Sequence, residues 1–248
     1  MNTVKQNIDK IKAEVQAYFG TSLPETAIAP INPKPIASLI DQTALLPTVC
    51  QKDVEQICLQ AIEHSFRTVC IAPRFVSFAQ KIIGPHPIEI ATVVGFPWGY
   101  NKSTIKRLEA LKARDNGATE IDMVIPIGAL KNKQWQVVRK DIQSVVDGAQ
   151  NCPVKVILET GFLQPDEIIA GSFIALLSKA RFVKTSTGFG PRGASLQDIE
   201  LLKATIGGKL GIKASGGIRD YETAMTFVRA GATRIGTSSG LQIIQGAP

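Results

Sequence analysis

The sequence predicts an α/β fold, and within that class a (β/α)8 TIM barrel with an extra N-terminal helix. Short runs of β-branched residues alternate with helical patterns, which is typical of strands that pair in parallel. Eight such pairs fit between residue 36 and the end of the 248-residue chain, and eight is the number in a TIM barrel. An open, doubly wound sheet is the alternative, but its nucleotide-binding form carries G-x-G-x-x-G after the first strand. At that point this chain reads DQTALLPT, which favours the barrel.

The N-terminal 35 residues are predicted to lie outside the barrel. Apolar residues recur at helical spacing over residues 4–19, which predicts an amphipathic helix that ends at Gly20. Four prolines between residues 24 and 35 then indicate an irregular connector. We therefore divide the chain into a helix with its proline-rich connector, residues 1–35, and a catalytic barrel domain, residues 36–248.

The elements of the barrel are predicted in order along the chain. Strands are expected where short β-branched runs occur, at residues 36–41, 67–72, 88–95, 119–125, 153–159, 181–187, 209–215 and 233–238. Helices are expected near residues 51–64, 73–83, 103–116, 134–149, 165–179, 195–206 and 219–230, with a short one after the last strand.

Composition excludes several classes of function. Two histidines and four cysteines, without C-x-x-C or H-E-x-x-H, predict neither a cofactor nor a metal site, although magnesium held by acidic residues stays open. The net charge of +7 is spread along the chain and not clustered, so no nucleic-acid partner is expected. No apolar run approaches the roughly 20 residues of a membrane span. Scattered cysteines are typical of a reducing compartment, so we expect a soluble, cytoplasmic protein with no membrane contact.

Three predicted strands carry a lysine, which is unusual because an uncompensated buried charge is costly. The residues are Lys155, Lys184 and Lys213, on the fifth, sixth and seventh strands. A single lysine of this kind can lie at the end of a strand, where its ammonium group reaches solvent, or form a structural ion pair. Successive side chains on a strand alternate between two faces, so all three can converge inside the barrel beside Asp122 of the fourth strand.

Converging lysines suit Schiff-base chemistry. A free lysine has a pKa near 10.4 and is almost entirely protonated at pH 7, so it is a poor nucleophile. A neighbouring ammonium and burial both lower that pKa. Two lysines with one acid could therefore attack a carbonyl, tune the attacking amine and transfer protons.

Two glycine-rich loops predict a phosphate site. Ser215-Gly216-Gly217 follows the seventh strand, and Gly236-Thr237-Ser238-Ser239-Gly240 follows the eighth. Loops at these positions commonly bind phosphate in TIM-barrel enzymes, because glycines let backbone amides approach the anion. The alternative for any one glycine pair is an ordinary turn, as we expect for Gly207-Gly208.

The chain resembles the deoxyribose-phosphate aldolases, lysine-dependent class I aldolases that fold as TIM barrels. The matching stretches run in family order over about 200 residues. They are LIDQTALL (39–46), VCIAPRF (69–75), GFPWG (95–99), EIDMVIPIGALK (120–131), VKVILETG (154–161), FVKTSTGFG (182–190), GIKASGGIR (211–219) and ATRIGTSSG (232–240). The resemblance implies the family reaction, reversible cleavage of 2-deoxy-D-ribose 5-phosphate to D-glyceraldehyde 3-phosphate and acetaldehyde, in deoxyribose phosphate catabolism.

The resemblance also assigns roles to residues. It makes Lys184 the Schiff-base former, Lys213 the lysine that perturbs it, and Asp122 the residue that transfers protons through water. Asp41 and Thr43 correspond to substrate-binding positions near the sugar hydroxyls, and Lys155 to a supporting charge. The remaining substrate-binding positions surround the phosphate, and they are Thr187, Gly188, Gly216, Gly217, Gly236, Ser238 and Ser239.

The first motif departs from the family pattern. The family usually has D-H-T-L-L-K-P, whereas here Gln42 replaces the histidine and Leu46 the lysine. This difference leaves the three catalytic positions intact and affects binding or stability at the rim.

Two alternatives to the aldolase stay open on sequence alone. One is another Schiff-base barrel that acts on a different phosphorylated aldehyde or keto acid. The other is a catalytically silent barrel that binds anions or RNA. The expected partner is a small phosphorylated sugar, and the chain is expected to form a homo-oligomer, either a dimer or a tetramer.

Overall fold

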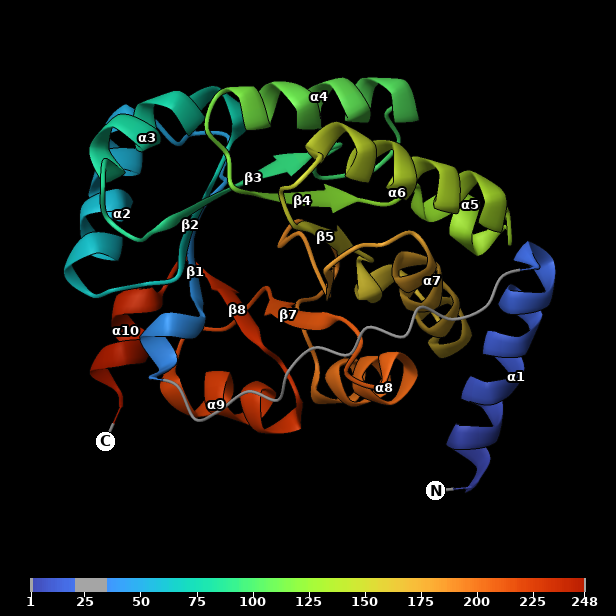
Figure 1. Ribbon diagram of the computed structural model, residues 1–248. Helices are drawn as coiled ribbons and strands as arrows, with labels where there is room; N and C mark the ends of the chain where they lie inside the picture. The colour runs from blue at the N-terminus through green and yellow to red at the C-terminus, as the bar shows by residue number, and fades with distance from the viewer. Residues whose placement is uncertain (1, 21–34, 248) are drawn as a thin grey trace.

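A computed structural model describes residues 2–20 and 35–247, and it confirms the predicted barrel. Eight parallel strands close into a ring in sequence order, from β1 round to β8 and back to β1. Helices lie outside the ring (Figure 1). The strands are β1 (Ile40–Ala44), β2 (Thr68–Ile71), β3 (Glu89–Val94), β4 (Glu120–Val124), β5 (Val154–Ile157), β6 (Phe182–Lys184), β7 (Gly211–Ser215) and β8 (Arg234–Thr237).

Each strand is followed by at least one helix, as the sequence predicts. The helices are α2 (Gln51–Glu63), α3 (Val76–Ile83), α4 (Ser103–Asp115), α5 (Ile127–Lys131), α6 (Trp135–Ala149), α7 (Pro165–Leu177), α8 (Leu196–Ile206), α9 (Tyr221–Ala230) and α10 (Gly240–Gln245). Two short 3-10 turns lie between strand and helix, η2 (Pro73–Phe75) and η3 (Thr160–Phe162). One helix was not predicted, α5, which has five residues and lies between β4 and α6.

The first strand begins later than predicted. Residues 36–39 form a 3-10 turn, η1 (Ile36–Leu39), and not the first four residues of the strand predicted over residues 36–41. The cause is local, because the Pro35 carbonyl accepts hydrogen bonds from both the amide and the hydroxyl of Ser38, at 2.9 and 2.8 Å. These bonds close a turn before the ladder with β2 begins.

The N-terminal helix α1 (Asn2–Phe19) confirms the helix predicted over residues 4–19 and packs against α7 and α8 in the outer layer. Asn7 donates a hydrogen bond to Asp166 at 2.6 Å, and the Tyr18 ring meets Trp135 edge to face. Figure 1 shows α1 beside α7 at the outer edge of the molecule. The proline-rich connector falls outside the described residues, so the division at residue 35 stays a prediction.

The two faces of the strands separate apolar from polar side chains. On β4, Ile121 and Met123 are buried in the main core between the ring and the helices. Asp122 points the other way and contacts lysines on neighbouring strands, so it lies inside the barrel. The alternation that places it there is the ordinary pleat of a strand.

A smaller apolar cluster lies inside the barrel, on β2 and β3. It consists of Cys70, Ala91 and Val93, with Leu45 and Phe96 packed against it. Cys70 Sγ is 4.0 Å from Asp122 Oδ2, so the cluster borders the carboxylate that the lysines contact. The interior of the barrel therefore holds a small apolar cluster beside its charged residues.

Candidate active site

Strand register places the three predicted lysines around the carboxylate of Asp122. Asp122 pairs with Lys155 across β4 and β5, and Lys184 pairs with Lys213 across β6 and β7. Lys184 Nζ and Lys213 Nζ both donate to Asp122 Oδ2, each at 2.8 Å, and Lys155 Nζ donates to Oδ1 at 2.8 Å. The prediction that these side chains converge is confirmed in its geometry.

Three further charged residues complete this arrangement. Lys213 Nζ also contacts Asp41, and Lys155 Nζ lies 2.7 Å from Glu120. Arg234 bridges the two carboxylates, with Nη1 2.7 Å from Asp41 and Nη2 3.0 Å from Glu120. We call the seven residues the charge cluster: Asp41, Glu120, Asp122, Lys155, Lys184, Lys213 and Arg234. All seven are buried.

The charge cluster holds four cations and three anions when all groups are ionised. Loss of one proton from a lysine would leave three cations and three anions, which removes the unbalanced buried charge. Two of the lysines hold their protons firmly. Burial alone would lower the pKa of Lys213, but the carboxylates of Asp122 and Asp41 outweigh it and raise that pKa. The same balance, with Asp122 and Glu120, raises the pKa of Lys155.

Asp122 is held in its ionised form. Burial alone would raise its pKa, but the ammonium groups of Lys155, Lys184 and Lys213 outweigh burial and keep the pKa well below its ordinary value. Lys184 differs from the other two lysines, because Asp122 is the one carboxylate within 4 Å of it among the described residues. Lys184 therefore has fewer carboxylate contacts than Lys155 or Lys213 has.

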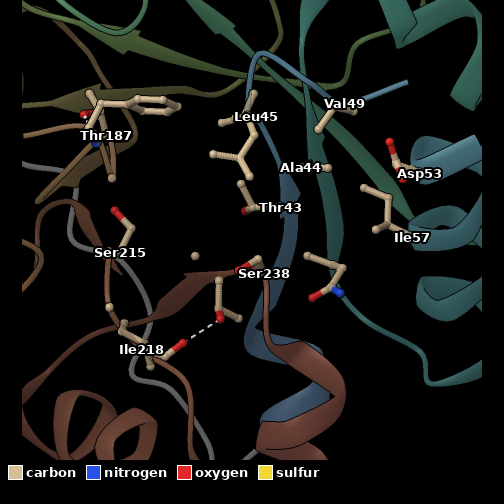
Figure 2. A pocket seen from close by; sticks show the side chains of 18 of the residues that line it. Thr43, Ala44, Leu45, Val49, Asp53, Ile57, Thr187, Ser215, Ile218 and Ser238 are labelled. Carbon is tan, nitrogen blue, oxygen red and sulfur yellow. Dashed lines mark hydrogen bonds between the residues drawn. The ribbon is translucent and has the colours of Figure 1, made fainter. Parts of the chain in front are cut away.

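A pocket of about 670 Å³ opens above the charge cluster. Of the three strand lysines, only Lys184 lines it. Figure 2 shows side chains from several elements around this space, with Thr43 on β1, Thr187 after β6, Ser215 on β7 and Ser238 after β8. The carboxyl ends of the strands surround the pocket, which is where TIM barrels carry their active sites.

Most of the predicted substrate-binding positions line this pocket. They are Thr43, Thr187, Gly188, Gly216, Gly217, Gly236 and Ser238. Asp41 and Lys155 lie beneath it in the charge cluster. Ser239 does not line the pocket, and its amide donates to Thr237 Oγ1 at 2.9 Å. The roles of all these residues stay predictions.

Hydrogen bonds join the loops after β6 and β7 at the pocket wall. Ser215 Oγ donates to the Ser186 carbonyl at 2.6 Å, and the Ser215 amide donates to Thr185 Oγ1 at 3.1 Å. The Ala194 amide in turn donates to the Ser215 carbonyl at 3.0 Å. The glycine-rich loop after β7 is therefore fixed relative to Lys184.

Gly236 is required by the lysine beside it. A Cβ at this position would lie 2.8 Å from Lys213 Cε and 3.0 Å from Ser215 Cβ. The glycine therefore lets the Lys213 side chain reach across β8 toward Asp41. This contact explains why residue 236 is a glycine, independently of any role in phosphate binding.

Gln42, where the sequence departs from the family pattern, forms a bridge in the wall of the pocket. Its Oε1 accepts from the Gly240 amide at 3.0 Å, and its Nε2 donates to Gln60 Oε1 at 3.1 Å. It thereby ties β1 to the first residue of α10 and to α2. Leu46, the second departure, is exposed at the rim of the pocket.

Three features of the site are not predicted by the sequence pattern. Glu120 and Arg234 were not singled out, although Arg234 holds two of the three carboxylates of the charge cluster. The contribution of α2 to the pocket, through Asp53, Gln56, Ile57 and Gln60, was also missed. Glu120 could have been found from its place in the sequence, because it is a charged residue two positions from Asp122 on the same strand.

A match to a family model shows to which protein family the chain belongs. Residues 36–246 match the model described as DeoC/LacD family aldolase. The chain belongs to the DeoC/LacD family of aldolases. The family resemblance and the barrel predicted from the sequence are both confirmed.

Individual members of this family are similar over most of the chain. A protein named deoxyribose-phosphate aldolase from Mannheimia succiniciproducens is 46% identical over 216 residues, which cover 87% of this chain and 96% of that protein. One of the same name from Thermotoga maritima is 46% identical over 211 residues, 85% of each chain.

Solved structures agree with the family assignment. The aldolase QR15 has a TM-score of 0.82 and 38% identity, covering 85% of this chain and 94% of its own. A tetrameric deoxyribose phosphate aldolase from Aeropyrum pernix has a TM-score of 0.78 and 28% identity, covering 95% of each chain. Among the residues that the structure describes, no helix combines the length and apolar character needed to cross a membrane.

Proposed function

We propose that this aldolase cleaves 2-deoxy-D-ribose 5-phosphate reversibly to D-glyceraldehyde 3-phosphate and acetaldehyde. The observation that carries the proposal is the position of Lys184. It is the one strand lysine that lines the pocket, and its Nζ shares Asp122 Oδ2 with the Nζ of Lys213. The relatives named deoxyribose-phosphate aldolase, at 46% identity, support the choice of substrate.

The reaction begins at Lys184. Its neutral amine attacks C1 of the open-chain sugar, and loss of water gives a protonated Schiff base. Lys213 stays charged beside it, and this second ammonium favours the neutral form of Lys184 by like-charge repulsion.

The bond between C2 and C3 then breaks. The C3 hydroxyl loses its proton to Asp122 through a water molecule, and its oxygen becomes the aldehyde oxygen of glyceraldehyde 3-phosphate. The electron pair of the broken bond moves toward the Schiff base and leaves an enamine on Lys184. Proton return to C2 and hydrolysis release acetaldehyde and restore the lysine. Asp41 and Lys155 maintain the charges around Asp122 in this scheme.

The phosphate end of the substrate lies at the mouth of the pocket. Backbone amides of Gly188, Gly216 and Gly217 and the hydroxyl of Ser238 would bind the phosphate. Thr187, Gly236 and Ser239 complete this side, and Thr43 lies where it can contact a sugar hydroxyl. No metal or cofactor takes part in the scheme.

We further infer that the enzyme works in the cytoplasm, in deoxyribose phosphate catabolism, and as a homo-oligomer. All four cysteines are free thiols, which suits a reducing compartment. The tetrameric relative from Aeropyrum pernix supports assembly from copies of one chain.

Borohydride trapping tests the proposal. The protein is incubated with acetaldehyde, reduced with borohydride and digested, and the peptides are analysed by mass spectrometry. We expect an ethyl group on Lys184, together with turnover of deoxyribose 5-phosphate that a chelator does not affect. A label on Lys155 or Lys213 contradicts the assignment, and absence of turnover contradicts the substrate.

A further inference from the structure

Glu159 has an unusual backbone conformation at the edge of the active site. It follows β5 with φ 56° and ψ 62°, in the left-handed region that side chains with a Cβ rarely adopt. Hydrogen bonds fix the backbone on both sides of it. The Leu158 amide donates to the Lys184 carbonyl at 3.0 Å, and the Thr160 amide to the Thr185 carbonyl at 2.9 Å.

One oxygen of the Glu159 carboxyl group holds the loop after β6. Both the amide of Thr187, at 3.0 Å, and its hydroxyl donate to Oε2. The Phe189 amide donates in turn to Thr187 Oγ1 at 3.0 Å. A chain of hydrogen bonds thus runs from Glu159 through Thr187 to Phe189, and Thr187, Gly188 and Phe189 all line the pocket.

The second carboxyl oxygen of Glu159, Oε1, adds to the free-energy cost of burying this side chain. Glu159 is 1% exposed, and its Oε1 is buried without a hydrogen-bond partner among the described residues. Gly190 lies so close that a Cβ there would be 2.7 Å from both Cδ and Oε1 of Glu159. Burial accordingly raises the pKa of Glu159, against the opposite effect of its hydrogen bonds from Thr187. Packing alone would be served better by an apolar side chain.

We propose that Glu159 is a positioning residue that sets the segment 187–189 for the phosphate group of the substrate. This inference rests on the proposed function and concerns a residue that acts on the same site through the residues that line it. Glu159 does not line the pocket itself, and Thr187, which does, is hydrogen-bonded to its carboxyl group. Because Lys184 precedes Thr187 by only three residues, the segment also fixes the distance between the phosphate and the nucleophile.

The test compares three variants with the wild-type protein. Glu159→Asn keeps a side chain that tolerates the left-handed region but is one methylene too short to reach Thr187. Glu159→Gln keeps an acceptor at full length. Lys179→Asn makes the same type of change at another left-handed residue, with φ 62°, which is exposed at the end of α7 and is not part of the pocket.

Each protein is assayed with deoxyribose 5-phosphate and with unphosphorylated 2-deoxyribose, and its affinity for inorganic phosphate is measured by calorimetry. Glu159→Asn should raise the KM for the phosphorylated sugar and weaken phosphate binding about tenfold, since two hydrogen bonds to a carboxyl group are lost. Its kinetics with 2-deoxyribose should change less than about twofold, because the phosphate contacts are not used. Glu159→Gln should restore most of the loss, and Lys179→Asn should match the wild type.

The outcomes separate this inference from the proposed function. The positioning role is overturned if Glu159→Asn affects both sugars equally, or if it affects neither sugar nor phosphate binding. The proposed function still stands in either case, provided that the wild type cleaves deoxyribose 5-phosphate. If the wild type does not cleave the sugar but binds phosphate more tightly than Glu159→Asn does, the positioning role stands and the function fails. If Glu159→Asn does not fold, Glu159→Gly takes its place, because glycine adopts the same conformation without cost.

Discussion

Lys184 and Lys213 donate hydrogen bonds to the same oxygen atom, Oδ2 of Asp122, and each Nζ lies 2.8 Å from it. Two ammonium groups on one oxygen repel each other, and the repulsion is relieved when one of them loses its proton. Lys213 has a second carboxylate, Asp41, whereas Lys184 faces the pocket. Lys184 is therefore the lysine that a substrate in the pocket can reach, and the one that we propose as the nucleophile.

Removal of Lys213 should move activity to higher pH. In Lys213→Leu the charge cluster keeps three cations and three anions with Lys184 protonated, so Lys184 no longer relieves an excess charge by deprotonation. We expect the alkaline shift of the kcat/KM profile to be about one pH unit or more. Lys131→Leu removes a lysine from a partly exposed pair with Glu167 and serves as the control. A profile of Lys213→Leu that coincides with the control would rule out a tuning role.

Asp122→Asn should lower stability in a pH-dependent way. The variant leaves three buried lysines without their shared carboxylate, at a cost of about 3–5 kcal/mol near pH 7. Because the folded pKa of Asp122 lies below the unfolded value near 3.9, the stability that its charge provides is present above that value and is lost as pH falls toward the folded pKa. Urea unfolding at several pH values should show a difference between wild type and variant that narrows on acidification. A constant difference contradicts this account.

Ser238→Asp should discriminate between phosphorylated and free sugars. Ser238 lies exposed at the pocket, and a carboxylate there would repel the substrate phosphate. We expect the KM for deoxyribose 5-phosphate to rise at least about tenfold, with little change for 2-deoxyribose. Ser238→Asn is the matched control, because asparagine is nearly the same size as aspartate and carries no charge. The phosphate lies elsewhere if both variants behave alike.

Gln42→Ala should destabilise the protein more than an alanine substitution nearby. The change leaves the buried Gly240 amide without its acceptor, which costs about 1–3 kcal/mol. Gln56→Ala, on an exposed position of α2 beside the same pocket, should stay within about 0.5 kcal/mol of the wild type. Chemical unfolding measures both differences, and equal values would show that the bridge has no energetic role.

The sequence predicts the barrel and the convergence of Asp122, Lys155, Lys184 and Lys213 because both follow from local periodicity. Alternation along a strand decides which side chains point inward, and parallel pairing in chain order decides which strands are neighbours. The start of the first strand is wrong for a local reason, the turn that the Pro35 carbonyl closes with Ser38.

Other parts of the site depend on contacts across the ring. Arg234 reaches Glu120 and Asp41 only because β8 closes against β1, and no local pattern reports the distances across a closed barrel. Glu159 was missed for a different reason. Its role depends on a left-handed backbone in a residue other than glycine, and the identity of the residue gives no sign of that conformation.

Of the seven residues of the charge cluster, Lys184 alone lines the pocket, so a substrate meets the cluster at a single amine. In the proposed reaction, acetaldehyde is attached to Lys184 at the bottom while glyceraldehyde 3-phosphate occupies the mouth. The phosphorylated product must then depart first and acetaldehyde second. In the direction of synthesis, acetaldehyde must likewise bind to Lys184 before its partner enters the pocket, so a large excess of glyceraldehyde 3-phosphate should obstruct its own condensation.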